Sequence, residues 1–270
     1  MPFDGGATHL GTEWTKNATR ILGIPLHSLG ELLLPDYIME AADDQQLLRE
    51  RLSGTYRQLL LNLLAGHLFA YNCWLAVKML ATHRRSVPGW LCLLPAALGM
   101  AAGIVAALSV FPVGLSCRRI SWYVGFAMVM AIICNSAIVL QKAYLVLYRQ
   151  RWVLFVGTLL LLPQLGFMYV AWMLSPVTVA ADTGCVVNYA PFLPWFWFGS
   201  TAPINLLFMG IFSHVAYKQY RRYGSDAWRK LARDGIQTMC LVVLCNIVCA
   251  CGMVLQLGGK FSEMFFLVDW

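Results

Sequence analysis

The chain has 270 residues, of which 59% are hydrophobic and only 12% are charged, and its net charge is +7. A soluble domain carries about 25% charged residues, so this composition excludes an ordinary soluble protein. Apolar runs of about twenty residues recur along the chain, long enough to cross a hydrocarbon core of about 30 Å. They predict an all-α, polytopic membrane helix bundle in a lipid bilayer. The basic residues lie in short segments between these runs, where they set membrane orientation, so we expect no nucleic-acid partner.

The first 55 residues are mixed and polar. We expect residues 1–55 to be an extracellular or lumenal tail, partly disordered, in front of a transmembrane helical domain over residues 56–270. Within the tail, "RILGIPLHSLGELLLP" (20–35) has apolar residues at roughly helical spacing. Two interpretations stay open here: a partly ordered tail with a short amphipathic piece, or a helix on the membrane surface. The sequon in "KNATR" (16–20) makes Asn17 a candidate for glycosylation.

Six complete spans are predicted after the tail. They cover residues 58–78, 90–112, 120–147, 152–174, 192–217 and 235–257, with the helix ends approximate. The chain then ends in "FFLVDW" (265–270), which begins like another span. As a helix, residues 264–270 would reach only about 10 Å. We therefore predict a truncated seventh span, which would hold the carboxylate of Asp269 inside the bilayer.

The positions of Lys and Arg along the chain predict the orientation. With the N-terminus outside, twelve of these residues lie on the inner side of the spans, and six lie on the outer side from Arg49 onward. Because positive charge is enriched on the cytoplasmic side, we expect an extracellular or lumenal N-terminus. Plasma membrane and endomembrane both stay open. The candidate cytoplasmic basic face, for a signalling partner, consists of Lys142, Lys218, Arg221, Arg222, Arg229, Lys230 and Arg233.

Two of the nine cysteines lie outside the predicted spans. Cys117 comes immediately before the third span, and Cys185 lies between the fourth and the fifth. The predicted topology puts both in an oxidising compartment, where a disulfide persists. We favour a disulfide between them; the alternative is two unrelated free thiols. The other cysteines have no His or carboxylate nearby, as a metal site would need, so we expect no metal.

Neutral polar residues take the place of charges inside the spans. From Gln58 to Leu257, no Asp, Glu, Lys or Arg lies in the middle of a span, and such charges are the usual mark of ion and proton pathways. We expect no enzymatic activity, no catalytic residue and no cofactor. Amide side chains in hydrocarbon need partners, which predicts an intramembrane polar network or, alternatively, simple packing contacts. The candidate network is Asn62, Asn72, Asn135, Asn205, Asn246 and Asp269.

Three strings carry a resemblance to a known group. "QKAYLVLYRQR" (141–151), "AYKQYRRYGSDAWRKLARDG" (216–235) and the final "FFLVDW" resemble uncharacterised fungal seven-transmembrane proteins that are similar to G-protein-coupled receptors. The resemblance implies a seven-span, receptor-like architecture. The chain departs from rhodopsin-type receptors at Gln141-Lys142-Ala143, where those receptors have an acidic–Arg–aromatic triplet.

The predicted function follows from this architecture. We expect a receptor-like integral membrane protein that senses an unknown small ligand and relays to a cytoplasmic partner. The alternative is a transporter or lipid-handling protein without enzymatic activity, and a structural or assembly protein is a third. An outward pocket between spans three, five and six would favour a receptor, whereas a pocket reaching the midplane from both sides would favour transport.

Overall fold

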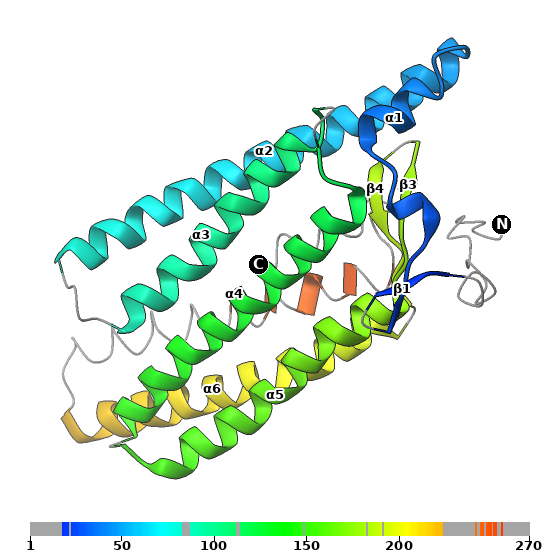
Figure 1. Cartoon of the computed structure of the whole chain (residues 1–270). Helices are drawn as coiled ribbons and strands as arrows, with labels where there is room; N and C mark the ends of the chain where they lie inside the picture. The colour runs from blue at the N-terminus through cyan, green and yellow to red at the C-terminus, as the bar shows by residue number, and fades with distance from the viewer. Residues whose placement is uncertain are drawn as a thin grey trace.

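A computed structural model describes five long helices joined by short connections (Figure 1). The described residues are 18–21, 23–82, 87–111, 114–147, 149–181, 183–190, 192–223, 241, 244–245, 247–249, 251–252 and 255. The long helices are α2 (Gln45–Thr82), α3 (Val87–Leu108), α4 (Cys117–Val146), α5 (Arg151–Leu174) and α6 (Leu193–Tyr223). All five are long and apolar enough to cross a membrane. The all-α class is therefore confirmed, and the helices are consistent with a membrane protein.

The helices run alternately in opposite directions. Each packs against the next in sequence, and α4 also packs against α6. The C-terminal ends of α2, α4 and α6 therefore lie at one end of the bundle and their N-terminal ends at the other (Figure 1). Buried clusters along α4, α5 and α6 form the core, one around Phe167 and Trp197 and another around Leu140 and Phe208.

Five of the six predicted spans correspond to these helices. The sixth, over 235–257, lies mostly outside the described residues, although several of its residues, from Leu241 to Gly252, are helical. The truncated seventh run over 264–270 lies entirely outside them. A sixth and a seventh span therefore stay predictions from the sequence.

The first helix begins earlier than predicted. It starts at Gln45 rather than near 58, so the end of the expected tail is continuous with the first span. The Oδ1 atom of Asp44 caps it by accepting bonds from the N–H groups of Gln46 (2.9 Å) and Leu47 (3.3 Å). At about 1.5 Å per residue, its 38 residues extend about 57 Å. The helix therefore projects beyond a hydrocarbon core of about 30 Å.

The segment over 20–35 does not form a membrane-surface helix, so that interpretation is wrong. It contains a small hairpin of β1 (Arg20–Ile21) and β2 (Ile24–Pro25), then a 3₁₀ turn, η2 (Ser28–Gly30), and the start of α1 (Leu34–Met39). Gly23 takes a φ of +82° at the hairpin turn, a conformation that favours glycine. These turns interrupt the apolar spacing that had suggested a helix.

A second hairpin connects α5 to α6. Its strands are β3 (Val177–Ala180) and β4 (Gly184–Val187), paired antiparallel with Val179 opposite Cys185. It contacts η2 and the helices α2 and α4. We use the name cap for residues 18–40 together with this hairpin, because they lie together at one end of the bundle (Figure 1).

Glycines allow a close contact between α2 and α3. A Cβ atom on Gly103 would come within 2.8 Å of the Cα atom of Gly66, and one on Gly99 within 2.5 Å of the Phe69 ring. Gly99 and Gly103 are four residues apart and therefore share one face of α3. Small residues at this spacing let membrane helices approach closely.

Candidate functional site

A disulfide anchors the cap to the bundle. It joins Cys117, the first residue of α4, to Cys185 in β4, with their Cα atoms 5.6 Å apart. Cys117 is 1% exposed, and it packs with Leu34, Val177 and Val179. This is the pairing favoured from the sequence.

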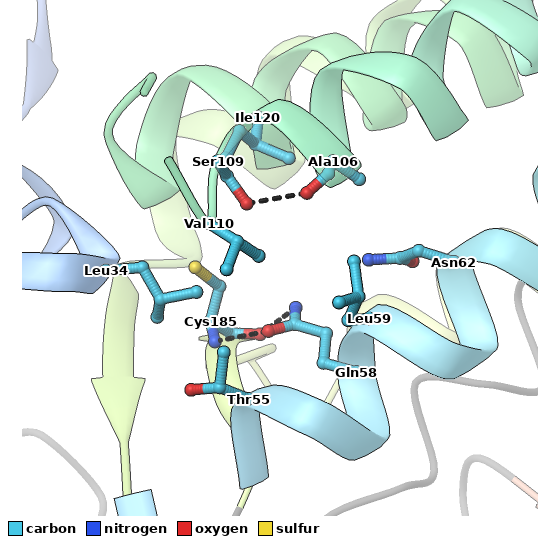
Figure 2. A pocket seen from close by; sticks show the side chains of 10 residues that line it. All are labelled: Leu34, Thr55, Gln58, Leu59, Asn62, Ala106, Ser109, Val110, Ile120 and Cys185. Carbon is cyan, nitrogen blue, oxygen red and sulfur yellow. Dashed lines mark hydrogen bonds between the residues drawn. The ribbon is translucent and has the colours of Figure 1, made fainter. Parts of the chain in front are cut away.

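A side chain of α2 holds the same strand a second time. The Nε2 group of Gln58 donates to the carbonyl of Cys185 (3.2 Å), and its Oε1 atom accepts from the Cys185 N–H (3.0 Å). Figure 2 shows both hydrogen bonds between Gln58 and Cys185. The neighbouring Gly184 has a φ of +79°, and a Cβ atom there would collide with the Gln58 amide. The hairpin is therefore fixed to two different helices.

Arg118 joins the N-terminal segment to the cap. Its side chain is buried, although arginine is almost never fully buried unless it is paired. It forms an ion pair with Glu31, and its Nη2 group donates to the carbonyl of His27 at 2.6 Å. Burial, and secondly the Arg118 charge, lower the pKa of His27 below its ordinary value of 6.5.

A second arginine links the N-terminal segment to α2. The guanidinium of Arg51 lies over the Tyr37 ring, 3.9 Å from its centroid, and pairs with the Glu40 carboxylate at 3.6 Å. Arg51 also donates to the carbonyl of Tyr37. The N-terminal part of α2 thus supports α1.

The space directly under the cap is small. It measures about 10 Å³ and is lined by residues of α2, α3, α4 and the cap, including Thr55, Asn62, Ser109 and Ile120 (Figure 2). A single water molecule needs about 10–15 Å³. This space therefore admits a water at most and is too small for an organic ligand.

A larger cavity lies between α2, α3 and α4, nearer the opposite end. Its volume is about 370 Å³, within the range of small-molecule sites. The residues that line it are mostly apolar, with two amides and one thiol: Phe69, Asn72, Leu75, Ala76, Met79, Cys92, Pro95, Ala96, Ala131 and Asn135. It adjoins the first three spans, whereas the pocket expected of a receptor lay between spans three, five and six.

The candidate polar residues fall at different places. Asn72 and Asn135 share the larger cavity, while Asn62 lines the small space under the cap. Within the described part of the chain, no side-chain hydrogen bond joins these three residues. Asn205 is half-buried in α6, and Asn246 and Asp269 lie outside the described residues. A wider network stays a prediction.

The end opposite the cap carries only positive charge among the described residues. Lys142 and Lys218 are exposed at the C-terminal ends of α4 and α6, as is Arg221. Arg222 lies in the last turn of the same helix, and Arg229, Lys230 and Arg233 lie outside the described residues. We call this end the basic end; its described members also include Lys78, Arg149 and Arg151. All described acidic residues lie instead between Glu31 and Glu50.

Sequence reasoning missed several functional features. Nothing in the sequence pattern distinguished Gln58 or Arg118. Their hydrogen-bond partners, Cys185 and His27, lie 127 and 91 residues away along the chain. The close contact at Gly103 did leave a signal, the Gly-x-x-x-Gly spacing from Gly99. No cluster of three or more His, Cys, Asp or Glu that could hold a metal occurs within the described ranges.

These features define a multi-pass α-helical membrane protein with one capped and one basic end. Comparison of the chain with protein-family models, with curated proteins and with solved structures finds no match. The comparisons therefore support no family, and the likeness to fungal seven-span proteins rests on the quoted sequence strings alone.

Proposed function

We propose that this protein is a receptor-like membrane sensor, which binds a small ligand and relays its state to a cytoplasmic partner. The observation that carries the proposal is the difference between the two ends of the bundle. One end is closed by a cap with a disulfide, and the other presents lysines and arginines without a described acidic residue.

The chemistry of each end supports one orientation. A disulfide persists in an oxidising compartment, which favours an extracellular or lumenal cap. Lys and Arg are enriched on the cytoplasmic side, which favours a cytoplasmic basic end. A partner at that end would carry complementary acidic groups. Both arguments give an N-terminus outside the cytoplasm.

The sizes of the two cavities support sensing over transport. A transport path must open to both sides of the membrane, but the space under the cap holds a water at most. The cavity of about 370 Å³ is large enough for a ligand. A ligand held there could favour one arrangement of the surrounding helices over another. Such a shift between two conformations is what a switch needs. The proposal includes no enzymatic activity.

Coupling between the ends tests this function. We would reconstitute the full-length protein in nanodiscs and compare it with a Cys117→Ser/Cys185→Ser variant by hydrogen exchange. A receptor-like protein should change protection at residues 142–147 and 218–223 when its cap is loosened, because two sites of a switch are coupled reciprocally. Gln58→Leu, which keeps the disulfide, should give a smaller change of the same kind. Cys73→Ser is the matched control.

Two outcomes would overturn the proposal. Faster exchange confined to the cap, with the basic end unchanged, would show that the ends are not coupled. Movement of a fluorescent phospholipid between the leaflets of reconstituted vesicles, measured by dithionite quenching, would support the lipid-handling alternative instead.

A further inference from the structure

We propose that the cavity between α2, α3 and α4 binds a neutral, hydroxyl-bearing apolar molecule from the bilayer, of the sterol or long-chain alcohol class. This inference names the ligand class of the proposed sensor, and its sensing role rests on that proposed function. The binding site itself is argued from the residues that line the cavity.

Small side chains create the space. Ala76, Ala96 and Ala131 come from three different helices, and all three are buried at the cavity. Close-packed interiors contain few voids larger than a water molecule, as the space under the cap illustrates. By contrast, the cavity of about 370 Å³ opens beside the exposed side chains of Leu75 and Met79, so an occupant could enter it from outside the bundle.

Two amides define the polar part of the occupant. Asn72 on α2 and Asn135 on α4 both line the cavity, and within the described residues neither side chain has a hydrogen-bond partner. Both residues are exposed in the bundle. A carboxamide offers both donors and acceptors, and one that faces lipid or an empty cavity within a bilayer lacks the partners that water would give it. A hydroxyl group can donate to one amide and accept from the other.

The absence of charge at the lining argues for a neutral head. None of the ten lining residues is ionisable as an acid or a base, apart from the thiol of Cys92. The nearest lysine along α2, Lys78, lies over the Trp74 ring, 5.5 Å from its centroid, and neither residue lines the cavity. A carboxylate or ammonium head would be buried without a counter-ion, which is costly in the membrane.

The rim indicates the route from the bilayer. Leu75 is 41% exposed and Met79 is 39% exposed, and both line the cavity from α2. Much of the rest of α2 is exposed and apolar, including Leu68 and Trp74. An apolar molecule dissolved in the bilayer would therefore meet this rim without passing the cap.

Photo-crosslinking tests the site. Full-length protein in phosphatidylcholine nanodiscs would be treated with a diazirine sterol, a diazirine long-chain alcohol or a diazirine fatty acid, and labelled peptides would be mapped by mass spectrometry. We expect saturable labelling of residues 69–79 or 92–96 by a hydroxyl probe. If only the sterol probe or only the alcohol probe labels the cavity, that result identifies which class of molecule supplies the hydroxyl group. Equal labelling by the fatty acid would contradict a neutral head.

Matched variants separate binding from folding. Asn72→Leu and Asn135→Leu should each weaken labelling about tenfold, as expected when one hydrogen bond to the bound molecule is lost. Asn62→Leu, the same change ten residues earlier in α2, should leave it unchanged. Leu75→Trp should block the rim, whereas Leu68→Trp should not. Labelling spread evenly along α2, or equal in all variants, would overturn the site.

The site and the sensing role can fail separately. Cavity labelling without any change in hydrogen exchange at the basic end would support the ligand site and contradict the sensing function. Coupling between the two ends without cavity labelling would support the sensing function and contradict this ligand site.

Discussion

Single side chains hold the cap by bonding to backbone groups. Gln58 binds both backbone groups of Cys185, and Arg118 donates to the His27 carbonyl. Each hairpin of the cap has only two strands, so the peptide groups at the outer strand edges have no partner strand. Buried peptide groups need partners, and the helices provide them through long polar side chains.

Replacing Gln58 by leucine should loosen the hairpin. Two backbone groups of Cys185 would lose their partners, and each lost bond costs about 1–3 kcal/mol when the group stays buried. We expect a lower melting temperature by intrinsic tryptophan fluorescence and faster exchange over β3 and β4. Gln46→Leu, at an exposed site on the same helix, should melt as the wild type does. Equal melting of the two variants would show that the Gln58 contact adds nothing.

Acid should loosen the N-terminal segment through His27. Its pKa is lowered in the folded protein, mainly by burial and then by Arg118, so the unfolded segment binds more protons near the ordinary value of 6.5. Stability is therefore present above that value and falls as the pH drops below it. Hydrogen exchange over residues 23–40 should quicken from about pH 7.5 to about pH 5.5, after correction for intrinsic rates.

The matched variant for this pH effect is His27→Gln. It keeps a polar side chain of similar size but cannot gain a proton, so its corrected exchange should depend less on pH. A pH dependence as steep as that of the wild type would assign the effect to another group.

At the scale of elements, α2 and α3 meet through glycines. Gly103 faces Gly66 so closely that a Cβ atom at position 103 would come within 2.8 Å of the Gly66 Cα atom. Between membrane helices, lipid contributes no hydrophobic drive to association, so close packing becomes the main attraction. The pair of α2 and α3 therefore depends on these small residues.

A methyl group at Gly103 should push the two helices apart. We expect Gly103→Ala to destabilise the protein by about 1–3 kcal/mol, the usual cost of overpacking. Gly166→Ala in α5 is the control, because a Cβ atom there meets nothing within 4 Å. The control should be neutral or slightly stabilising, since alanine favours helix. Denaturation in graded detergent mixtures measures both, and a neutral Gly103→Ala would refute the close contact.

At the scale of the whole molecule, the described charges are divided between the two ends of the bundle. The described acidic residues lie between Glu31 and Glu50, close to Arg49 and Arg51, whereas the described part of the basic end has none. A bilayer with an anionic cytoplasmic leaflet attracts basic segments beside the spans. The division therefore favours one orientation for the bundle as a unit.

Glycosylation at Asn17 would report that orientation. If the N-terminus is translocated, the sequon at Asn17 meets the glycosylation machinery. Protein made in a eukaryotic host should then shift on a gel after glycosidase treatment. Asn17→Gln should abolish the shift. An unmodified Asn17, together with protection of the N-terminus from protease added outside intact cells, would place the cap in the cytoplasm.

The sequence predicted the membrane class, five of the helices and the pairing of Cys117 with Cys185. These predictions follow from hydropathy, from span length and from the side of the membrane on which each loop falls. All three can be read from short stretches of sequence or from counts of residues. It did not predict the fold over residues 20–40, because Arg118, which holds that segment, is far along the chain. The cavity at Asn72 and Asn135 was also missed, since it depends on which small residues from three helices meet.

The disulfide also changes the connectivity of the polypeptide. Its two cysteines are 68 residues apart in sequence, and the chain between them contains α4, α5 and β3. The covalent loop closed in this way crosses the bilayer twice, with its far tip at Arg149 and Arg151. A single tryptic cut at that tip would open the loop without releasing a fragment. The nicked protein should therefore run as one band on a gel until a reductant separates the two pieces.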